Sequence, residues 1–417
     1  MARKMKDSGI EWIGEIPEGW EVSQLKYATR WKSEKGCPDA PVLSLYRDFG
    51  VVPKDSRDDN HNVTSLDTSN YKVVDIGDLV INKMKAWQGS MAVSDYRGIV
   101  SPAYHVCSIT SNKVNKRYLH HLLRNPAYLP EYARLSTGMR IGQWDLGFDD
   151  FKNIPFLIPP LDEQAKIADY LDNGCASLDV ILNKTRSSIK EYKKLKQAVI
   201  TQAVTKGIRG EREMKDSGVE WIGEIPKEWK CQKLKYTIFP QNRPVFSTDE
   251  IITCFRDGIV TLRKNRREDG FTVSFTEHGY QGVEIGDLVI HGMDAFAGAI
   301  GCSDSRGKTT PVVHVCTTTG NNRFFMFFLR HMAYSNIFMD FSNGIRIRSS
   351  DFRNFTKLGI FDVLVPPIAE QNEIADYLDA KCTEIDKLIA KKEQLVKELE
   401  NYKKSLIYEV VTGKREV

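Results

Sequence analysis

The sequence lacks the features that would place the chain in a membrane or in an oxidising compartment. No apolar run approaches about 18 residues, so no transmembrane helix is predicted. The basic start Met1–Lys6 is not followed by an apolar stretch, so no signal peptide is visible. The eight cysteines form no CxxC pair, and two pairs of them recur at equivalent positions of a repeat (Cys107 with Cys316, Cys175 with Cys382). We interpret them as small buried residues, and we expect a reducing, cytoplasmic location.

Catalytic and metal-binding signatures are missing as well. The sequence has no GxxxxGK[ST] phosphate loop, no GxGxxG after a strand, no HExxH and no cysteine cluster with metal-ligand spacing. His105 and Cys107, like their matches His314 and Cys316, alternate along one predicted strand, which favours a repeated core contact. The sequence NPAY at Asn125–Tyr128 lacks the second proline of the methyltransferase motif NPPY and becomes HMAY in the other copy, so it is predicted to be a helix turn. No catalytic site is predicted.

The most informative feature that is present is a long internal repeat. The segment MKDSGIEWIGEIPEGWEVSQLKY (Met5–Tyr27) returns as MKDSGVEWIGEIPKEWKCQKLKY (Met214–Tyr236), an offset of 209 residues. The sequence IGDLVI recurs at the same offset, and IADYLD recurs after 207 residues (167–172 and 374–379). This period is far above the roughly 20–50 residues of solenoid repeats. The chain is therefore interpreted as two copies of one module, and its target is expected to have two halves.

Each copy contains a globular part after its opening GxEWIGEIPxxW segment, which is predicted to be a turn that packs its tryptophans on a neighbour. The globular part has about 130 residues, and a hydrophobic content of 41% is ample for a packed core. Apolar runs such as Ile76–Ile81 and Phe156–Ile158 read as strands, with helical stretches among them (115–135 and 323–341). The predicted class is α/β or α+β, and the strand order cannot be derived.

A long helix is predicted at the end of each copy. Pro159-Pro160 precedes a segment to about Thr205 with no proline and one glycine, and Pro366-Pro367 precedes a matching segment to about Thr412. Apolar residues at 3,4 spacing with Lys and Glu between them indicate a coiled coil, and the nearest partner for each helix is the other one. The predicted seam residues are Ile167, Leu171, Leu178, Ile181, Tyr192, Leu195 and Val199 in the first helix, and Ile374, Leu378, Ile385, Leu388, Leu395, Leu399, Tyr402 and Leu406 in the second.

The charge pattern is compatible with a nucleic-acid partner but does not demand one. The formal net charge is +4; residues 21–160 hold 18 Lys and Arg against 15 Asp and Glu, and residues 230–367 hold 17 against 13. Such mildly basic globular parts fit nucleic acid and equally fit an ordinary solvated surface. The copies diverge most at 28–70 and 237–280, whereas their opening segments and helices are nearly identical. Divergent surfaces suit two different targets, and shared surfaces suit one common partner.

Candidate contact residues follow from charge, glycine and divergence between the copies. The run Arg263–Arg267 (RKNRR) is the densest basic stretch and is predicted to lie in a loop that contacts phosphate. The loops 138–140 and 344–346 place an arginine after a glycine, and the nearby Gln143 and Arg348 differ between the copies, as base-reading residues would. The predicted nucleic-acid contacts are Lys83, Lys85, Gln88, Arg140, Gln143, Arg263, Lys264, Arg266, Arg267, Arg346 and Arg348.

Together these motifs resemble the DNA-sequence specificity subunit of type I restriction–modification systems. The carrying features are the opening segment, the IGDLVI strand, the S[TN]GxR loops (136–140 and 342–346) and the helix starts PPLDEQAKIADYLD and PPIAEQNEIADYLD, which span nearly the whole chain. In that family two target recognition domains each read one half of a bipartite DNA site, and two helical regions form an antiparallel spacer. The resemblance implies a non-catalytic subunit with an asymmetric two-part target.

The resemblance also implies the domain limits, the partners and the cofactors. The expected domains are target recognition domains at 1–158 and 211–365 and spacer helices at 159–210 and 366–417. The expected partners are double-stranded DNA, two modification (methyltransferase) subunits and two restriction/translocase subunits. No cofactor is expected in this chain; S-adenosylmethionine, ATP and magnesium are expected in the partner subunits.

Two alternatives remain open at this point. The chain could be a stand-alone two-headed DNA-binding regulator, which tight sequence-specific binding by the isolated chain would favour. It could instead be a protein scaffold, which an absence of salt-dependent DNA binding would favour.

Overall fold

The computed structural model describes residues 3–47, 49–56, 64–140, 143–266, 277–340 and 352–417. It divides into two compact units, and each holds one globular part with portions of both long helices. The first unit comprises Met1–Arg186 and Gln394–Val417, and the second comprises Ser187–Glu393. Helix α4 (Leu161–Lys206) and helix α8 (Ile368–Val411) therefore each contribute residues to both units.

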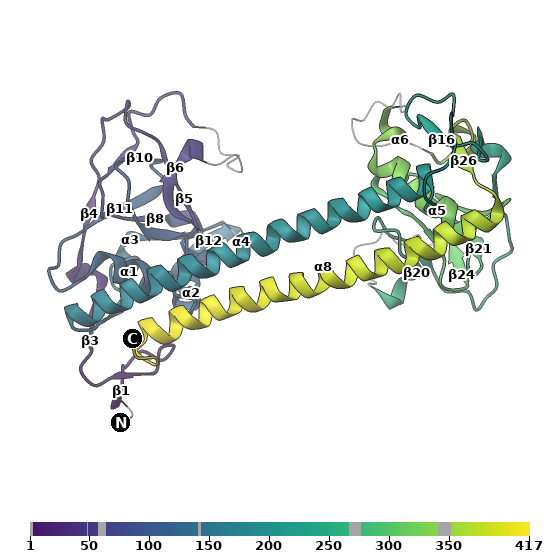
Figure 1. The fold of residues 1–417 in the computed structure, drawn as a ribbon. Coiled ribbons are helices and arrows are strands. Elements are labelled where there is room, and N and C mark those ends of the chain that lie inside the picture. Colours follow the sequence, from purple (N-terminus) through teal and green to yellow (C-terminus); the bar gives the residue numbers. More distant parts are fainter. Residues whose placement is uncertain (1–2, 48, 57–63, 141–142, 267–276, 341–351) are drawn as a thin grey trace. The chain divides into compact units, whose positions relative to one another are not determined.

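The first unit is built around a four-stranded antiparallel sheet in the order β4-β11-β8-β9 (Figure 1). Its elements before α4 are β1 (Met5–Asp7), β2 (Glu15–Pro17), β3 (Glu21–Gln24), η1 (Leu25–Tyr27), β4 (Thr29–Lys32), β5 (Leu43–Tyr46), β6 (Gly50–Pro53), η2 (Lys54–Ser56), β7 (Lys72–Val74), β8 (Leu79–Asn82), η3 (Lys83–Gln88), β9 (Met91–Val93), β10 (Gly98–Val100), β11 (Tyr104–Ile109), α1 (Lys116–Leu123), η4 (Pro126–Tyr128), α2 (Leu129–Leu135), β12 (Ser136–Arg140), β13 (Gln143–Leu146), α3 (Phe148–Phe151) and β14 (Pro155–Ile158).

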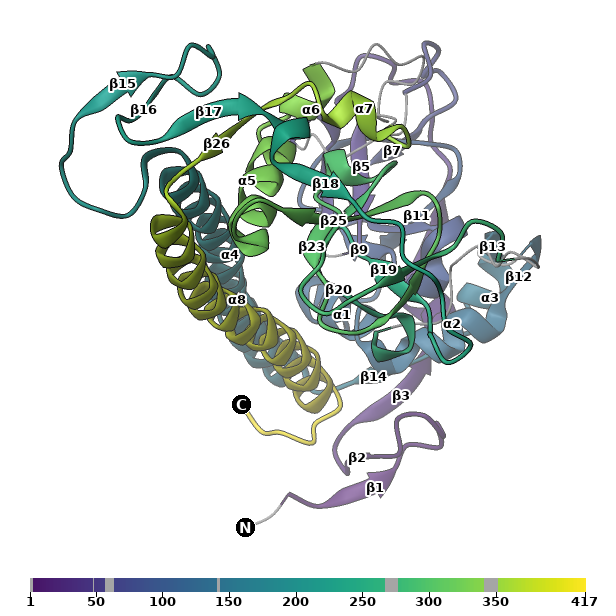
Figure 2. The same ribbon diagram turned by 90° about the vertical axis from the view of Figure 1, so that its right-hand side faces the viewer.

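The second unit repeats this order around the sheet β18-β25-β22-β23, and Figure 2 shows α5 beside it. Its elements are β15 (Met214–Asp216), β16 (Glu224–Pro226), β17 (Lys230–Lys233), η5 (Leu234–Tyr236), β18 (Ile238–Pro240), β19 (Ile252–Cys254), β20 (Val260–Leu262), η6 (Arg263–Asn265), β21 (Gln281–Val283), β22 (Leu288–His291), η7 (Ala295–Ala297), β23 (Ile300–Cys302), β24 (Gly307–Thr309), β25 (Val313–Thr318), α5 (Asn322–Tyr334), α6 (Ile337–Asp340), α7 (Phe355–Leu358) and β26 (Asp362–Val365).

The strand β8 is apolar at consecutive positions because both faces of its sheet are covered. Leu79 and Ile81 pack into the larger core with α1, while Val80 packs on the other face with residues of the β5–β6 hairpin. In the second unit Val289 of β22 packs in the same way with the β19–β20 hairpin. The ladders between the described strands are antiparallel, so α+β is the correct choice between the two predicted classes.

The opening segment of each copy is a β-hairpin, and the neighbour on which one of its tryptophans packs, as the predicted turn required, is the start of a long helix. Gly9 and Gly14 adopt φ of 71° and 72°, which a β-carbon would disfavour. Trp20 is fully buried and its indole N–H donates to Glu163 of α4 over 3.0 Å. Trp229 is buried likewise and donates to Glu370 of α8 over 3.0 Å.

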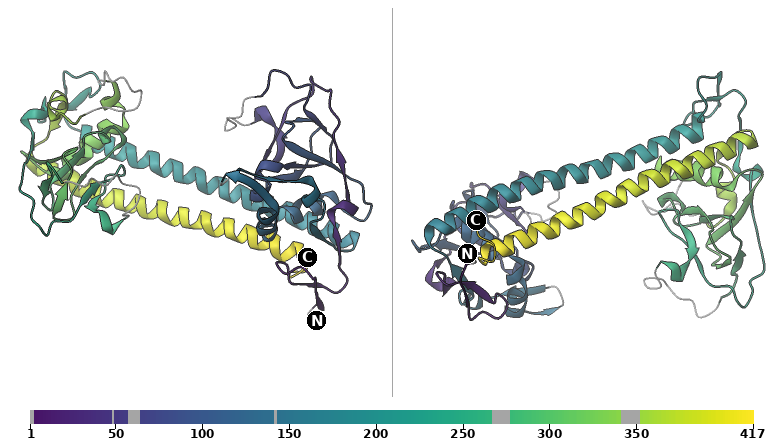
Figure 3. Two further views of the ribbon diagram at one scale, coloured as in Figure 1. Left: turned by 180° about the vertical axis from the view of Figure 1, so that it is seen from behind. Right: turned by 60° about the horizontal axis from the view of Figure 1, so that its bottom comes forward.

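Helices α4 and α8 pack antiparallel within each unit, which confirms the predicted helix pair (Figures 1 and 3). In the first unit Lys403 of α8 donates to Asp179 of α4 over 2.6 Å. In the second unit Lys196 of α4 donates to Asp386 of α8 over 2.6 Å. Partner numbers rise along α4 as they fall along α8, so the chain directions are opposed. Among the described residues, no helix combines the length and the apolar content needed to cross a membrane.

The predicted seam was wrong at several positions. Four of its members are exposed: Ile181 (46%), Leu195 (49%), Leu395 (41%) and Tyr402 (50%). The side chains buried in their place are Leu182, Thr185, Ile189, Cys382 and Ile389. The buried residues of the helix pair follow a strict 3,4 alternation, and some of these positions are polar. The prediction chose only apolar residues, so at those positions it took the exposed neighbour instead.

The helical stretch predicted at 115–135 is also interrupted. It forms α1, the 3₁₀ turn η4 and α2, because Asn125 and Pro126 end the first helix. The Asn125 side chain is fully buried and accepts the backbone N–H of Ala127 over 3.0 Å. The NPAY sequence is therefore a capped helix turn, as predicted.

Candidate nucleic-acid interface

The first-unit candidates lie on two segments that the fold brings together. Lys83, Lys85 and Gln88 belong to η3, while Arg140 and Gln143 face each other across the β12–β13 hairpin. The two segments are joined by an ion pair of 2.9 Å between the Lys83 ammonium and a carboxylate of β13, and by an edge-on tryptophan pair.

The residues that join these segments are Asp145 and the pair Trp87–Trp144, whose ring centroids are 5.1 Å apart. Trp87 is thus half-buried against the hairpin. Lys85 is exposed beside them. Residues 57 and 62 positions apart in the sequence therefore share one surface of the first unit.

The second-unit candidates begin as a short helix rather than the predicted loop. Arg263 and Lys264 lie in η6, and Arg266 follows it directly. Lys264 pairs with Glu250 at 2.6 Å, and Arg266 forms two bonds to Asp257, at 2.9 and 2.5 Å. These cations are held by carboxylates at a partly exposed surface, where an ion pair contributes little stability and a phosphate can compete for the guanidinium.

Several candidates lie outside the described residues. They are Arg267, Arg346 and Arg348, and the loop 342–346 with them. For Arg140 and Gln143 the backbone register is described and the side chains are not. The predicted contacts of these five residues remain predictions.

The repeated histidines and cysteines are buried core residues, as predicted. His105 bonds the carbonyl of Leu146 over 3.1 Å, and His314 bonds that of Phe352 over 2.6 Å. Burial lowers the pKa of both imidazoles, and it raises the pKa of the Cys107 thiol to about 12. Neutral histidines and protonated thiols in these positions serve packing, and the described residues contain no His, Cys, Asp and Glu group suited to a metal ion.

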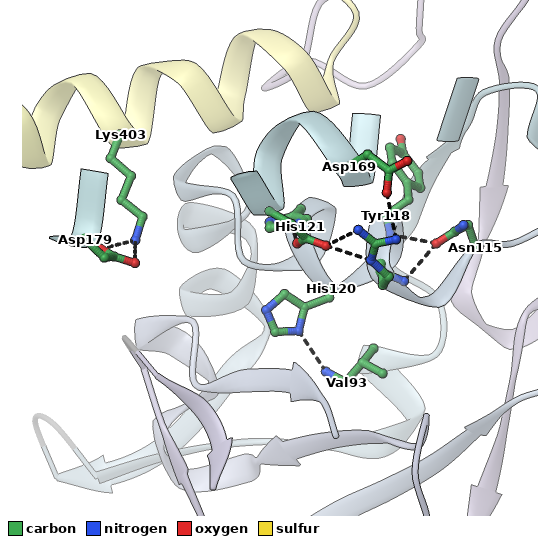
Figure 4. Close-up of polar contacts among 10 residues, drawn as sticks. Val93, Asn115, Tyr118, His120, His121, Asp169, Asp179 and Lys403 are labelled. Atoms are coloured by element: carbon green, nitrogen blue, oxygen red, sulfur yellow. Dashed lines mark hydrogen bonds and ion pairs between the residues drawn. The ribbon is translucent and has the colours of Figure 1, made fainter. Parts of the chain in front are cut away.

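A second repeated feature, not anticipated from the sequence, anchors each globular part to its long helix. Arg117 of α1 pairs with Asp169 of α4 at 2.8 Å, and it also bonds Asp172. In the second unit the matching Arg323 pairs with Asp376 and Asp379 at 2.7 and 2.6 Å. Figure 4 shows Asp169 beside Asn115 and Tyr118 at the start of α1.

The helix start behind each of these arginines is capped in the same way. Asn115 and Asn321 are the N-caps, and each side chain accepts two backbone N–H groups. The backbone N–H of each asparagine donates to a glutamine of the long helix, at 2.7 Å to Gln164 and at 2.9 Å to Gln371. His120, also drawn in Figure 4, is half-buried and accepts the backbone N–H of Val93, and desolvation lowers its pKa to about 3. It is a neutral structural residue.

Large apolar side chains are exposed at matched positions of both copies. The pairs are Tyr27 and Tyr236 (70% and 60%), Ile76 and Ile285 (68% and 71%), Met84 and Met293 (49% and 45%), Leu161 and Ile368 (51% and 55%), and Tyr170 and Tyr377 (37% and 36%). Single exposed apolar residues are normal on a protein surface. Apolar residues that are exposed at equivalent positions of both copies instead indicate a surface that the two copies share. Their matching offsets are visible in the sequence; their exposure is not.

Comparison with known proteins agrees with this architecture. Residues 17–191 match the family model described as type I restriction modification DNA specificity domain. The putative type I restriction enzyme MjaX specificity subunit of Methanocaldococcus jannaschii is 24% identical over 96% of this chain and 95% of its own length. The type I restriction enzyme MjaVIII specificity subunit of the same organism is 26% identical over 64% of this chain and 60% of its own length.

Two solved structures share the fold. One, described as the structural basis underlying complex assembly and conformational transition of the type I R-M system, has a TM-score of 0.66 and 14% identity, and covers 96% of this chain and 99% of that one. The crystal structure of the HsdS subunit from Thermoanaerobacter tengcongensis has a TM-score of 0.50 and 14% identity, and covers 96% of this chain and 98% of that one.

The duplicated α+β units with their shared long helices have the fold of these two solved structures. The particular similarity is to type I restriction–modification: residues 17–191 match the model of its DNA specificity domain, and 96% of the chain is similar to a putative specificity subunit. The resemblance derived from the motifs is confirmed. The relatives are named as specificity subunits, in agreement with the expected non-catalytic role.

Proposed function

We propose that each unit reads one half of a bipartite, asymmetric sequence in double-stranded DNA, within a type I restriction–modification complex. One observation carries the proposal: two units of the same fold keep their framework and differ in their polar surface groups. Lys83 and Lys85 of the first unit stand where the second has Gly292 and Asp294. A shared framework with different surface donors and acceptors is what two different half-sites require.

The helices α4 and α8 are the proposed spacer between the half-sites. Each is continuous through portions of both units, and a helix of 46 residues is about 70 Å long at 1.5 Å per residue. Packed helices resist bending far better than a flexible linker does, so they suit a fixed gap.

We further propose that a methyltransferase subunit docks on each unit at a surface called here the shared strip. It consists of Ile76, Arg117, Asp169 and Tyr170 in the first unit, and of their matches Ile285, Arg323, Asp376 and Tyr377 in the second. The members adjoin one another, since the Lys116 side chain lies over Gly77 and Asn322 donates to the Gly286 carbonyl at 2.8 Å. An exposed apolar residue beside a fixed ion-pair network suits a protein partner.

The partners would supply the chemistry that this chain lacks. We expect methyl transfer from S-adenosylmethionine in two modification subunits, and magnesium-dependent ATP hydrolysis with DNA cleavage in two restriction/translocase subunits.

The direct test is an adenine-methylation map of cells that express the chain with its modification subunit, compared with cells that lack the chain. The expected result is a new motif with two unlike halves and a fixed gap. An assembled complex that produces no such motif would contradict the proposal. Tight sequence-specific binding by the isolated chain would favour the regulator alternative, and no salt-dependent DNA binding in any form would favour the scaffold.

Substitution of the shared strip tests the docking surface. Ile76→Asp and Ile285→Asp place a charge in the proposed apolar contact, so each single variant is expected to retain one modification subunit and the double variant none. Native mass spectrometry of the purified complexes measures the stoichiometry.

The matched controls are exposed apolar residues that are not shared by the copies. Tyr96→Asp and Ile259→Asp change residues exposed by 43% and 48%, whose matches are Ser305 and Gly50. Both controls are expected to retain full stoichiometry. Loss of subunits in the controls, or their retention in the Ile76 and Ile285 double variant, would exclude the strip.

A further inference from the structure

The second unit contains an open cleft whose lining is rich in hydrogen-bond donors. Its volume is about 760 Å³, and it lies between the β19–β20 hairpin, the start of η6 and the end of β22. Arg256, Arg263 and Arg266 line it, together with His291 and Asp294. The Arg263 Nε donates to the hydroxyl of Thr253 over 3.2 Å. Asp257 lines the cleft too and binds Arg266 through two hydrogen bonds, so Arg256, which donates one hydrogen bond to Asp294, is the arginine that we consider for a ligand that accepts hydrogen bonds.

Arg256 is held in place by a residue far away in the sequence. Its Nη2 donates to Asp294 over 2.9 Å, although Asp257 is its direct neighbour. The arginine side chain is 68% exposed, so the pair contributes little stability. The pair instead orients the Arg256 side chain. Because the Asp294 carboxylate binds one part of the guanidinium, it restricts the rotamers of Arg256 and leaves other N–H groups for a ligand.

His291 adds a donor whose tautomer is fixed by the backbone. Its Nδ1 accepts the backbone N–H groups of Met293 and Asp294, at 3.3 and 3.1 Å. Burial lowers the pKa of the imidazole, so the ring is neutral near pH 7. A neutral ring that accepts at Nδ1 carries its proton at Nε2, which makes Nε2 a donor.

The first unit keeps the arginine and changes the groups around it. Arg47 matches Arg256, whereas Asn82 and Lys85 stand in place of His291 and Asp294. A conserved arginine with different neighbours is the pattern expected where two units read different bases. The carboxylate that orients Arg256 has no equivalent at position 85, so the two arginines are held differently.

We propose that this cleft reads a guanine in the half-site of the second unit. Arg256 donates to the major-groove edge of the base, which presents the acceptors O6 and N7; Asp294 is a positioning residue for the guanidinium, and His291 supplies another donor. The inference rests on the proposed DNA-reading function of the unit and assigns particular residues to it.

The test uses the full chain in complex with its modification subunit, and reads both the methylation map and binding to duplexes that carry each base in turn at every position of the second half-site. Arg256→Lys keeps the positive charge and loses the two parallel N–H donors of the guanidinium. We expect it to reduce the preference for guanine at one position by about 10- to 100-fold, with the first half-site and the salt dependence unchanged. Asp294→Asn keeps the size of the side chain and is expected to weaken the same preference by a smaller factor.

The control and the contrary outcomes are distinct. Arg209 is an exposed arginine of the same unit that bonds Glu373 in a bidentate pair outside the cleft, and Arg209→Ala is expected to keep every base preference. Uniform weakening of all sequences by Arg256→Ala, with a smaller salt slope, would make Arg256 a phosphate contact and overturn the guanine assignment. Unchanged preference in the Arg256→Lys complex would also overturn it while the bipartite motif stands. Absence of any bipartite motif with the unaltered chain would remove the proposed function itself.

Discussion

Insertion of one heptad into both α4 and α8 is expected to lengthen the gap between the two half-sites and to leave each half-site unchanged. The matched insertion points follow Ser187 and Gln394, which are 207 residues apart, as the two helices are. Seven residues add about 10 Å of helix, which corresponds to at most about three base pairs at 3.4 Å each. Methylation at the original motif should disappear, because both halves can no longer be engaged together. The methylation map measures the new gap.

A heptad in α4 alone is the control for this experiment. It displaces the Lys196–Asp386 and Lys403–Asp179 pairs relative to each other, so the helices cannot keep both. This variant is expected to lose helix packing and methylation together. If the double insertion leaves the original gap unchanged, the helices do not set the distance between the half-sites.

Replacement of Arg212 by alanine is expected to destabilise the second unit by about 3 kcal/mol, which is the lower end of the range for breaking a buried ion pair. The Glu370 side chain is 2% exposed, and Arg212 contacts it at 2.7 Å. The guanidinium also lies 5.3 Å from the centre of the Trp229 ring. Without the arginine, the carboxylate keeps the indole N–H as a donor but loses its counter-charge. Hydrogen exchange of the segment 213–230 measures the local loss of protection.

The equivalent ion pair of the first unit is the matched comparison for Arg212→Ala, and a double variant tests whether the lost stability can be recovered. Arg3 and Glu163 form the equivalent pair with side chains exposed by 28% and 19%, so Arg3→Ala is expected to cost clearly less. The double variant Arg212→Met with Glu370→Gln removes both charges and keeps an acceptor for the indole. It should recover most of the lost stability. An equal loss in the single and the double variant would show that the charge is not the cause.

Much of the fold was predictable because it depends on periodicity and on the repeat. The long helices follow from proline-free segments with 3,4-spaced apolar residues, and the buried strands from runs such as Leu79–Ile81. The seam was predicted wrongly at Ile181 and Leu195 because the true stripe passes through the buried Thr185 and the half-buried Lys196, which no apolar pattern marks. Polar side chains can occupy a seam when an antiparallel partner supplies the opposite charge, as Asp386 does.

The candidate interface was predictable in composition and not in geometry. The basic run at 263–267 and the arginine after Gly138 are visible in the sequence. The joining of η3 to the β12–β13 hairpin through Asp145 is not, because it depends on how the strands are ordered. The same holds for Arg256, which the sequence places beside Asp257 and the fold pairs with Asp294.

The sequence by itself determined that this protein is a duplication, that each copy ends in a long helix, and that no recognised catalytic motif is present. These properties are local or repetitive, so they can be read along the chain. Only the tertiary structure decided which seam residues are buried, which apolar residues stay exposed in both copies, and which carboxylate orients each arginine. Those are contacts between residues far apart in sequence, and they are fixed by strand register and helix packing, which no short stretch of sequence encodes.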